Sequence, residues 1–195
     1  MRIGVLVSGR GSNLEALLEA GLEVVLVVAN RPGARALRIA DDHGVRALVL
    51  ARTAFPDVDA RDAAIGQALD AAEVELVVLA GYDQLLRPGY FAAYRGRTIN
   101  VHPSLLPRHG GVGMMGLAVH RSVLAAGDEE TGATIHEVTT ELDGGPILAQ
   151  TQVPVIPGDD ADGLAARVLE AEHRLLVATV RQLGSASREV ASQVR

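Results

Sequence analysis

The sequence predicts an α/β fold, a Rossmann-like three-layer sandwich whose mostly parallel sheet has an antiparallel C-terminal extension. In residues 1–101, short apolar segments alternate with segments whose apolar residues recur at helical spacing. Continuously apolar strands between helices are typical of a parallel sheet that helices cover on both faces. Two β-like segments on either side of a turn-rich stretch at residues 143–146 predict the antiparallel extension.

The first half is expected to contain the parallel strands. Val, Leu and Ile dominate the expected strands at residues 3–7, 22–29, 45–50, 76–80 and 97–101. The spacing of apolar residues predicts helices at residues 14–20, 34–42 and 57–72. Gly21 and Gly44 end the first two helices, because glycine readily adopts the left-handed conformation that closes a helix.

The second half has a different pattern. A helix is expected at residues 117–126, strands at 131–138 and 147–155, and a long amphipathic helix at 160–183. The polar tail from Gly184 is expected to be loose. No internal repeat or linker is visible, so we expect a single domain over residues 1–195, with halves at 1–101 and 102–183 and the tail at 184–195.

The composition excludes several classes of protein. The chain has 195 residues, of which 48% are hydrophobic and 3% aromatic, and its formal net charge is −6. An acidic chain with few aromatic side chains is a poor ligand for nucleic acid or for an anionic membrane surface. No apolar run reaches the ~18–20 residues of a membrane span, and residues 1–7 are typical of a buried strand rather than of a leader peptide. We therefore expect a soluble, cytoplasmic protein.

Neither a metal site nor a common nucleophile motif is expected. The absence of cysteine excludes disulfides, thiolate zinc sites and cysteine nucleophiles. The six histidines show neither H-x-x-x-H nor H-E-x-x-H spacing, and no G-x-S-x-G sequence is present. Any catalytic site must therefore be built from other polar groups.

The strongest candidate for a catalytic site is the stretch Asn100-Val101-His102-Pro103, at the end of an expected strand. Side chains two residues apart on a strand point to the same face, so Asn100 and His102 can address one substrate atom together. An amide donor beside a ring that can carry a proton suits a carbonyl that becomes an oxyanion. The alternative is a histidine that only satisfies backbone groups at the end of a strand.

A second candidate site is the glycine-rich loop Ser-Gly-Arg-Gly-Ser-Asn at residues 8–13, between a strand and a helix. Its backbone N–H groups can cradle a phosphate at the helix N-terminus, although the loop matches neither named nucleotide motif. The alternative is a tight turn in which Ser12 or Asn13 caps the helix. This loop and residues 100–102 both follow strands, and ligands of parallel sheets bind at that edge.

Asp143 is the third candidate. In the stretch Asp143-Gly144-Gly145-Pro146 an aspartate is most often a turn-forming residue. Placed beside His102, however, its carboxylate would favour the imidazolium form, which can stabilise a developing oxyanion. Asp143 could also help to move protons through water.

Four motifs, in this order, resemble those of the phosphoribosylglycinamide formyltransferases, a family of the formyltransferase superfamily. They are S-G-R-G-S-N at residues 8–13, A-G-Y at 80–82, I-N-V-H-P-S-L-L-P at 99–107 and E-L-D-G-G-P-I at 141–147. The resemblance runs from residue 1 to about residue 183. It implies a folate-dependent one-carbon transferase of purine biosynthesis, which moves the formyl group of the co-substrate 10-formyltetrahydrofolate to the amine of glycinamide ribonucleotide without a metal.

The resemblance also implies roles for individual residues. His102 would be the general acid that stabilises the oxyanion, and Asn100 would position the formyl oxygen. Asp143 would tune His102 and assist proton transfer, and Glu172 would contact the ribonucleotide. The residues that would hold the substrate phosphate are Gly11, Ser12 and Asn13.

The resemblance implies that residues from both halves line the folate site. The first half would be the phosphate- and nucleotide-binding half, and the second the folate-binding and catalytic half. The folate-binding residues would be Arg61, Asp83, Gln84, Leu85, Leu86, Asn100, Val138, Thr139 and Glu141. Two departures from the family pattern concern affinity more than chemistry. Asp83-Gln84 stands where the family usually has an apolar residue and an arginine, and Met115 stands where related versions often have tyrosine.

Related activities provide the alternatives. A formyltetrahydrofolate deformylase is similar but carries an additional N-terminal domain, whereas here the first strand is expected to start at residue 3. A methionyl-tRNA formyltransferase adds a C-terminal domain for tRNA, whereas this chain stops at residue 195. A non-catalytic nucleotide-binding module would use only residues 9–13. We expect small-molecule partners, no nucleic acid or membrane, and a monomer or homodimer.

Overall fold

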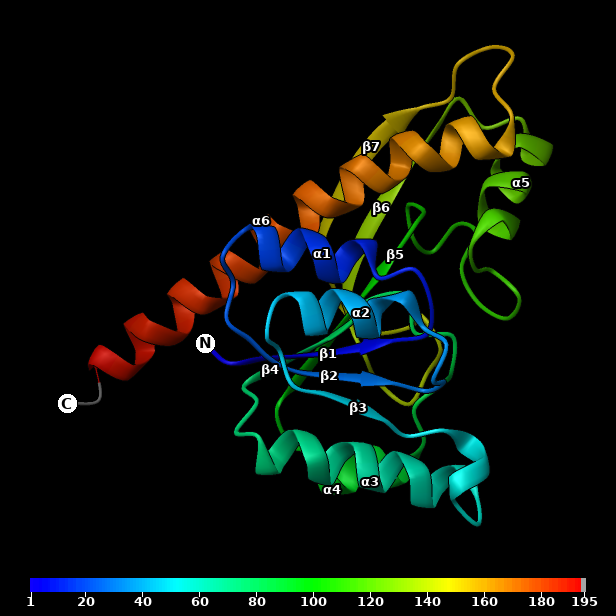
Figure 1. The fold of residues 1–195 in the computed structure, drawn as a ribbon. Coiled ribbons are helices and arrows are strands. Elements are labelled where there is room, and N and C mark those ends of the chain that lie inside the picture. The colour runs from blue at the N-terminus through cyan, green and yellow to red at the C-terminus, as the bar shows by residue number, and fades with distance from the viewer. Residues whose placement is uncertain (194–195) are drawn as a thin grey trace. The chain divides into compact units, whose positions relative to one another are not determined.

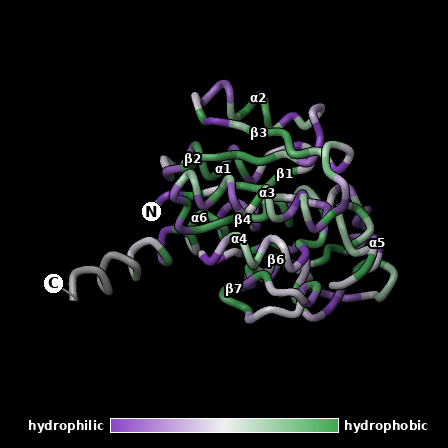
Figure 2. Tube along the Cα trace, turned by 90° about the horizontal axis from the view of Figure 1, so that it is seen from below, coloured by the Kyte–Doolittle hydropathy of each residue, from purple (hydrophilic) through white to green (hydrophobic). Residues whose placement is uncertain are grey.

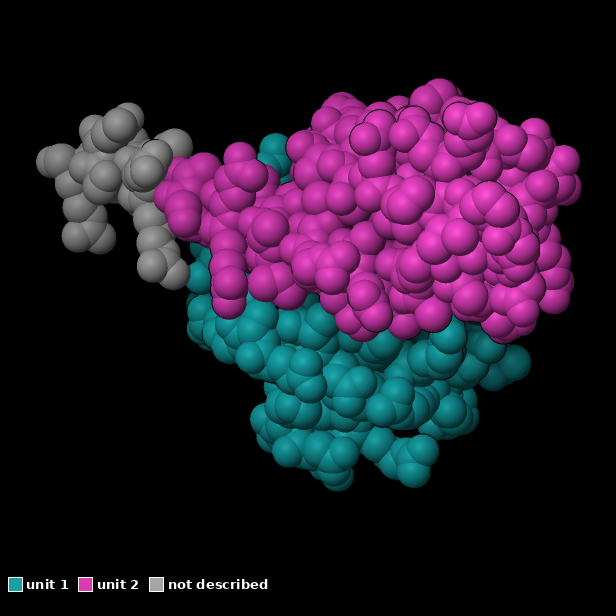
Figure 3. Space-filling model, turned by 90° about the horizontal axis from the view of Figure 1, so that it is seen from above, with its two compact units in different colours: residues 1–99 teal, residues 100–195 magenta. Residues whose placement is uncertain are grey.

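The chain divides into two compact units, and the first of them contains parallel strands. The structure, a computed structural model, describes residues 1–193, and side chains as far as residue 186. Unit 1 is Met1–Ile99 and unit 2 is Asn100–Arg195, and Figure 3 colours them separately. Their boundary falls between residues 99 and 100.

Unit 1 contains the parallel strands that the sequence predicts. Their order is β3-β2-β1-β4, and each neighbouring pair is parallel. Every residue of β1 and β4 is buried, which explains their continuously apolar sequences, and Figure 2 shows β1 and β2 as largely hydrophobic. The bounds are β1 Ile3–Val7, β2 Val24–Ala29, β3 Ala47–Val49 and β4 Leu76–Leu79.

Three of these strands are shorter than predicted, β4 by the single residue Ala80. Strand β2 begins at Val24 rather than at residue 22, because the N–H of Leu22 donates to the carbonyl of Leu17 at 3.2 Å and so belongs to the closing turn of the preceding helix. Strand β3 is the last in the hydrogen-bonding order and is only partly buried. An edge strand pairs with a neighbour on one side only and buries less apolar surface, so β3 is shorter than the central strands.

Helices cover both faces of the sheet in unit 1. Helices α1 and α2 lie on one side of the strands, and α3 and α4 lie on the other (Figure 1), which gives the predicted three layers. The short helix α4 was not predicted; Pro88 at its start is the only sequence signal, because proline suits the first turn of a helix. The bounds are α1 Ser12–Glu19, α2 Arg35–Asp42, η1 Arg52–Ala54, α3 Val58–Ala71 and α4 Pro88–Ala93.

Unit 2 contains the antiparallel extension. Strands β6 (Glu130–Glu137) and β7 (Ile147–Pro154) pair in antiparallel fashion, and the order is β5-β6-β7. Strand β5 (Arg97–His102) begins in the last residues of unit 1 and ends in unit 2. Helix α5 (Leu117–Ala126) contacts α6, and α6 lies along β6 and β7 (Figure 1). The predicted α/β fold with an antiparallel C-terminal extension is confirmed.

The last helix is longer than predicted. Helix α6 spans Ala161–Gln193, so the prediction that it ends at residue 183 is wrong. A glycine inside a helix costs only about 1 kcal/mol relative to alanine, which is not enough to end a helix whose flanking residues favour it. The N-terminal part of α6 packs against α5 and β7 through an apolar cluster. The cluster consists of Val123, Val153, Leu164, Val168 and Ala171. Within the described residues, no helix combines the length and the apolar character that a membrane crossing requires.

Helix α3 contains a buried ion pair between two adjacent residues. The guanidinium of Arg61 donates to Asp62 Oδ1 from Nε at 2.8 Å and from Nη2 at 2.6 Å, and both side chains are fully buried. The other carboxylate oxygen of Asp62 accepts the backbone N–H of Arg87 at 2.8 Å, immediately before α4. One aspartate therefore neutralises a buried cation and also attaches the start of α4 to α3.

We predict that Asp62→Ala lowers the free energy of unfolding by about 3–5 kcal/mol, because it leaves the Arg61 guanidinium buried without its counter-ion. Urea unfolding followed by circular dichroism measures the change. Glu170→Ala is the control, because Glu170 pairs with Arg174 at 3.9 Å on an exposed face of α6 and such pairs contribute little. A loss in Asp62→Ala no larger than in the control would contradict the prediction.

Candidate active site

Three predicted catalytic residues meet in unit 2. Asn100 and His102 lie at the end of β5, and Asp143 lies in the turn that leads into β7. His102 Nδ1 is 3.9 Å from Asp143 Oδ2, and Asp143 Oδ1 is 3.6 Å from Nε2 of His136. The same Nε2 atom is 3.1 Å from Asn100 Nδ2. The expected convergence of the amide, the imidazole and the carboxylate is therefore observed, with a second imidazole between them.

His136 is the residue of this cluster that the sequence analysis missed. It lies on β6 where the register with β7 shifts, between Ile135 and His136, and such bulges often re-aim side chains beside functional sites. Its Nδ1 lies 2.9 Å from the carbonyl oxygen of Glu137. Because a carbonyl can only accept, Nδ1 carries the proton, and Nε2 of the neutral ring accepts from Asn100 Nδ2.

This hydrogen bond orients the Asn100 amide. One N–H of Nδ2 points to His136 at 3.1 Å, so the amide is held in one of its two flip states. Burial lowers the pKa of His136, and this outweighs the opposing effects of the Glu137 carbonyl and the Asp143 carboxylate. His136 is therefore neutral near pH 7 and can act as the acceptor that this orientation requires.

Asp143 is held by the backbone as well as by the histidines. Its Oδ2 accepts the N–H of Gly111 at 2.8 Å. Asp143 itself has a φ of 52°, in the left-handed region that aspartate tolerates better than most residues. Its side chain is only 11% exposed, so the carboxylate acts on His102 in an environment that water screens weakly.

The ring of His102 is anchored on its other nitrogen. His102 Nε2 lies 2.9 Å from the carbonyl oxygen of His109, so Nε2 must be the donor and must carry a proton. The nitrogen that faces Asp143 is therefore Nδ1, and Nδ1 is the position at which a proton can be gained or lost. His102 is buried, with 5% of its surface exposed.

The glycine-rich loop lies in unit 1 at the start of α1. Gly11 is the N-cap of the helix with a φ of 79°, and a Cβ there would lie 2.8 Å from Cα of Ala36. Glycine is therefore required on two grounds, backbone conformation and the close approach of α2. No side chain caps α1, so the alternative in which Ser12 or Asn13 is the cap is wrong. Asn13 is buried and Ser12 is partly exposed.

Asp83 joins the ends of two strands in unit 1. Its Oδ1 accepts from Ser8 Oγ at 2.9 Å and from Asn30 Nδ2 at 2.7 Å, and its Oδ2 pairs with Arg31. Burial acts to raise the pKa of Asp83, but the hydrogen bonds from these three residues outweigh it and hold the pKa below its usual value. The Asp83 carboxylate therefore supports the loop that follows β1.

Arg61 lies on α3 and Asn100 on β5, and the other predicted folate-binding residues lie in two segments. Beside Asp83, Gln84 accepts from Arg61, while Leu85 is exposed and Leu86 is buried. After β6, Thr139 Oγ1 donates to the carbonyl of Glu141 at 3.3 Å and accepts its N–H at 3.2 Å, and Val138 is partly buried.

The remaining predicted site residue, Glu172, lies on α6 and is 7% exposed. Across the described part of the chain, no group of three or more histidine, cysteine or acidic side chains is placed to hold a metal ion.

Comparison with known proteins shows which family this chain belongs to. The formyl transferase family profile matches residues 1–180. The chain belongs to the formyl transferase family. The phosphoribosylglycinamide formyltransferase of Escherichia coli (strain K12) is 40% identical and covers 90% of this chain and 83% of its own length. The phosphoribosylglycinamide formyltransferase of Mycobacterium tuberculosis (strain ATCC 25618 / H37Rv) is 42% identical, and the match covers 94% of this chain and 85% of that relative.

Solved structures support the same family. The crystal structure of glycinamide ribonucleotide transformylase 1 from Symbiobacterium toebii is similar, with a TM-score of 0.89 and 38% identity, over 95% of this formyl transferase and 88% of that chain. The trifunctional purine biosynthetic protein adenosine-3 of Drosophila melanogaster is 40% identical over 98% of this chain, which spans only 15% of that relative.

We predict that the stability of this formyl transferase falls as pH drops through 6.5, in part because of His136. Burial lowers the pKa of His136 from 6.5 in the folded state. The unfolded chain therefore binds a proton there first, and stability that is complete above pH 6.5 is lost as pH falls toward the folded pKa. Urea unfolding at a series of pH values should give a shallower loss for His136→Gln. His43→Gln, at an exposed histidine, should keep the wild-type loss, and equal profiles for all three proteins would contradict the assignment.

Proposed function

We propose that the chain transfers the formyl group of 10-formyltetrahydrofolate to the amine of glycinamide ribonucleotide, giving formylglycinamide ribonucleotide and tetrahydrofolate in de novo purine biosynthesis. The observation that carries the proposal is the cluster of Asn100, His102 and Asp143, with His102 Nδ1 facing the carboxylate at 3.9 Å. The similarity to phosphoribosylglycinamide formyltransferases over most of the chain supports the choice of substrates.

The chemistry needs two donors at the formyl oxygen. The amine attacks the formyl carbon, and the carbonyl electrons move onto oxygen to form an oxyanion. Asn100 directs the second N–H of its amide to this oxygen, because the first is held by His136. His102, protonated at Nδ1 as well as at Nε2, donates from Nδ1. Both donors are oriented before the substrate binds, so little reorganisation is required in the transition state.

Proton movement follows from the same contacts. The attacking amine loses a proton, and the departing folate nitrogen gains one when its bond to the formyl carbon breaks. His102 Nδ1 exchanges protons with the intermediate, and the Asp143 carboxylate stabilises the imidazolium while this happens. Asp143 also assists transfer through water, because its partly exposed side chain lies between the two imidazoles.

The substrate phosphate binds at the start of α1. Backbone N–H groups at a helix N-terminus and the positive end of the helix dipole favour an anion. Glu172 on α6 contacts hydroxyl groups of the ribonucleotide, since a carboxylate is a strong acceptor for them. The residues that hold the phosphate are Gly11, Ser12 and Asn13.

The segment that follows β4 and the segment that follows β6 each supply folate-contacting residues, as the resemblance implies. Backbone groups of these segments supply most of the contacts to the pterin, and Arg61 acts on the folate through Gln84, to which its guanidinium donates. The folate-contacting residues are Asp83, Gln84, Leu85, Leu86, Asn100, Val138, Thr139 and Glu141. Residues 1–195 act as a single catalytic domain with small-molecule partners only, as a cytoplasmic monomer or homodimer.

We predict that the purified chain consumes 10-formyltetrahydrofolate only when glycinamide ribonucleotide is present. The release of tetrahydrofolate, followed by absorbance, measures the reaction, and water alone is the control acceptor. His102→Ala should lower kcat by about 10²–10⁴-fold, since it removes the general acid, while circular dichroism shows an unchanged fold. Release in water alone would instead indicate a deformylase. No release with either acceptor would indicate a binding module.

We predict that Ser12→Asp raises KM for glycinamide ribonucleotide by about tenfold, since a second anion at the helix N-terminus repels the phosphate. KM for the folate should stay near its wild-type value. Because an acidic residue in the first turn stabilises a helix, thermal unfolding separates this effect from misfolding. Unchanged steady-state kinetics would place the phosphate elsewhere.

A further inference from the structure

A hydrogen-bonded network beside the catalytic cluster holds the carbonyl that anchors His102. His109 presents its carbonyl oxygen to His102 Nε2 at 2.9 Å. Its own ring is bonded at both nitrogens: Nδ1 lies 2.8 Å from Ser122 Oγ and Nε2 lies 2.7 Å from Asp128 Oδ2. The backbone of His109 therefore contacts the His102 ring, while its side chain bonds Ser122 within α5 and Asp128 just beyond the end of that helix.

The direction of each hydrogen bond can be assigned. The carboxylate of Asp128 only accepts, so His109 Nε2 carries a proton. In the neutral ring Nδ1 then accepts from the hydroxyl of Ser122. The hydrogen bond from His109 lowers the pKa of Asp128, and the nearby Arg108 adds to this effect. Asp128 is therefore ionised over the working pH range and remains an acceptor for His109.

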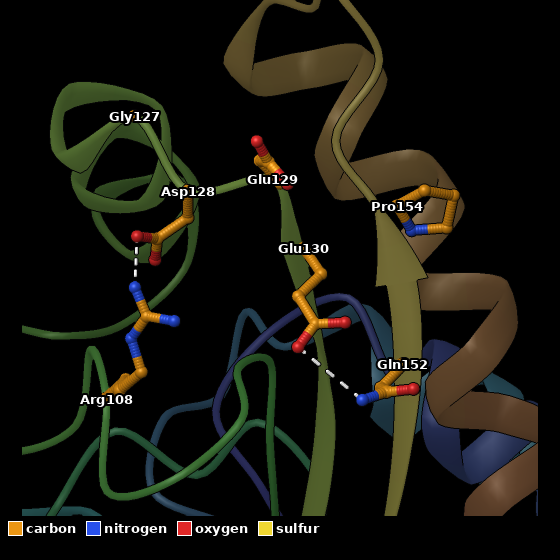
Figure 4. Close-up of a pocket in the computed structure, with 7 residues that line it drawn as sticks. All are labelled: Arg108, Gly127, Asp128, Glu129, Glu130, Gln152 and Pro154. Atoms are coloured by element: carbon orange, nitrogen blue, oxygen red, sulfur yellow. Dashed lines mark hydrogen bonds and ion pairs between the residues drawn. The ribbon is translucent and has the colours of Figure 1, made fainter.

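Arg108 secures the same carboxylate from the other side. It pairs with Asp128 Oδ1, while His109 bonds Oδ2. Figure 4 shows Arg108 reaching Asp128 at the rim of an open hollow of about 610 Å³ that Gly127, Glu129 and Glu130 also line. With 8% of its side chain exposed, Asp128 has little freedom to move, so it is a rigid attachment for the His109 ring.

The backbone of His109 needs such an attachment. The φ of His109 is 54°, in the left-handed region that residues other than glycine rarely adopt. Such a conformation persists only where surrounding contacts hold it. Ser104 Oγ donates to the neighbouring carbonyl of Arg108 at 2.7 Å. Two residues later, Gly111 donates its N–H to Asp143 at 2.8 Å. The same turn therefore contacts both His102 and Asp143.

We propose that His109, held by Asp128 and Ser122, is a positioning residue that fixes the His102 ring with its proton on Nε2 and leaves Nδ1 as the nitrogen that exchanges protons with the substrate. The proposal rests on the proposed role of His102 in formyl transfer. His109 touches no substrate. It acts by keeping a carbonyl in place, and a carbonyl at Nε2 excludes the tautomer that carries its proton on Nδ1 alone.

The test compares His109→Phe with His109→Gln. Phenylalanine fills a similar space but lacks both ring nitrogens, while the amide of glutamine can still donate to Asp128. Asp128 keeps Arg108 as a partner in either variant, so both should fold. The matched control is His43→Phe, at an exposed histidine in unit 1 whose Nδ1 lies 2.9 Å from the carbonyl oxygen of Ile39.

Two measurements are made on each protein. Steady-state kinetics gives kcat and KM for both substrates. The ¹⁵N chemical shifts of the His102 ring, recorded near pH 9 where an unperturbed imidazole is neutral, report which nitrogen carries the proton. His109→Phe should lower kcat by about tenfold to a hundredfold with little change in KM, and should convert the Nε2–H signal of His102 to a mixture of tautomers. His109→Gln should recover most of the wild-type kcat and most of the Nε2–H signal of His102, and His43→Phe should match the wild type.

Several results would overturn the proposal. A His102 ring that keeps its Nε2–H signal in His109→Phe shows that the His109 side chain does not set the tautomer, whatever the effect on kcat. A wild-type kcat, or a rise in KM alone, shows that it does not position the catalytic ring. If His109→Phe fails to fold, Asp128→Asn and Ser122→Ala are measured in the same way, and unchanged His102 signals in both decide against the proposal.

The proposed function fails separately. Full activity of His102→Ala would remove the catalytic role of His102, while the ¹⁵N shifts of the wild type and of His109→Phe would still show whether the network controls the ring. Loss of activity in His102→Ala together with an unchanged His102 tautomer in His109→Phe would retain the proposed function and overturn the inference about His109.

Discussion

The candidate active site depends on the shared carboxylate of Asp143. Its Oδ2 is held by the N–H of Gly111 at 2.8 Å and faces His102 Nδ1 at 3.9 Å, while its Oδ1 faces His136 Nε2 at 3.6 Å. A carboxylate favours the charged form of an imidazole beside it, and here two imidazoles lie beside one carboxylate. Burial lowers the pKa of His136 and keeps that ring neutral. The carboxylate is therefore available to His102, and the neutral ring is available to orient Asn100.

Three residues in or beside this arrangement lie where the backbone is irregular. Asp143 and His109 both have left-handed φ values, 52° and 54°, and His136 lies at a shift in the register of β6 with β7. A left-handed residue other than glycine costs on the order of 1–3 kcal/mol. The hydrogen bonds of the two side chains, to Gly111 and to Asp128, offset that cost. These two side-chain contacts thus stabilise the backbone around the candidate site.

Unit 1 accommodates a charged side chain where neighbouring strands end. The Asp83 carboxylate is satisfied by Ser8 and Asn30, which follow the ends of β1 and β2, and by Arg31. A charged group in this position is tolerated because every partner comes from strand ends that the parallel pairing already brings together. The interior of unit 1 therefore keeps the apolar strands that the sequence predicted.

The sequence by itself determined the strands, most of the helices, the glycine-rich loop and the residues Asn100, His102 and Asp143, because local periodicity and short motifs encode them. It did not reveal α4, which is too short to show a periodicity, nor the end of α6, because a single glycine does not end a long helix. The contacts of His136 and His109 became visible only in the tertiary structure. His136 meets Asn100 across 36 positions, and His109 meets Asp128 across 19. Such contacts depend on how the chain folds back on itself, and no local pattern records them.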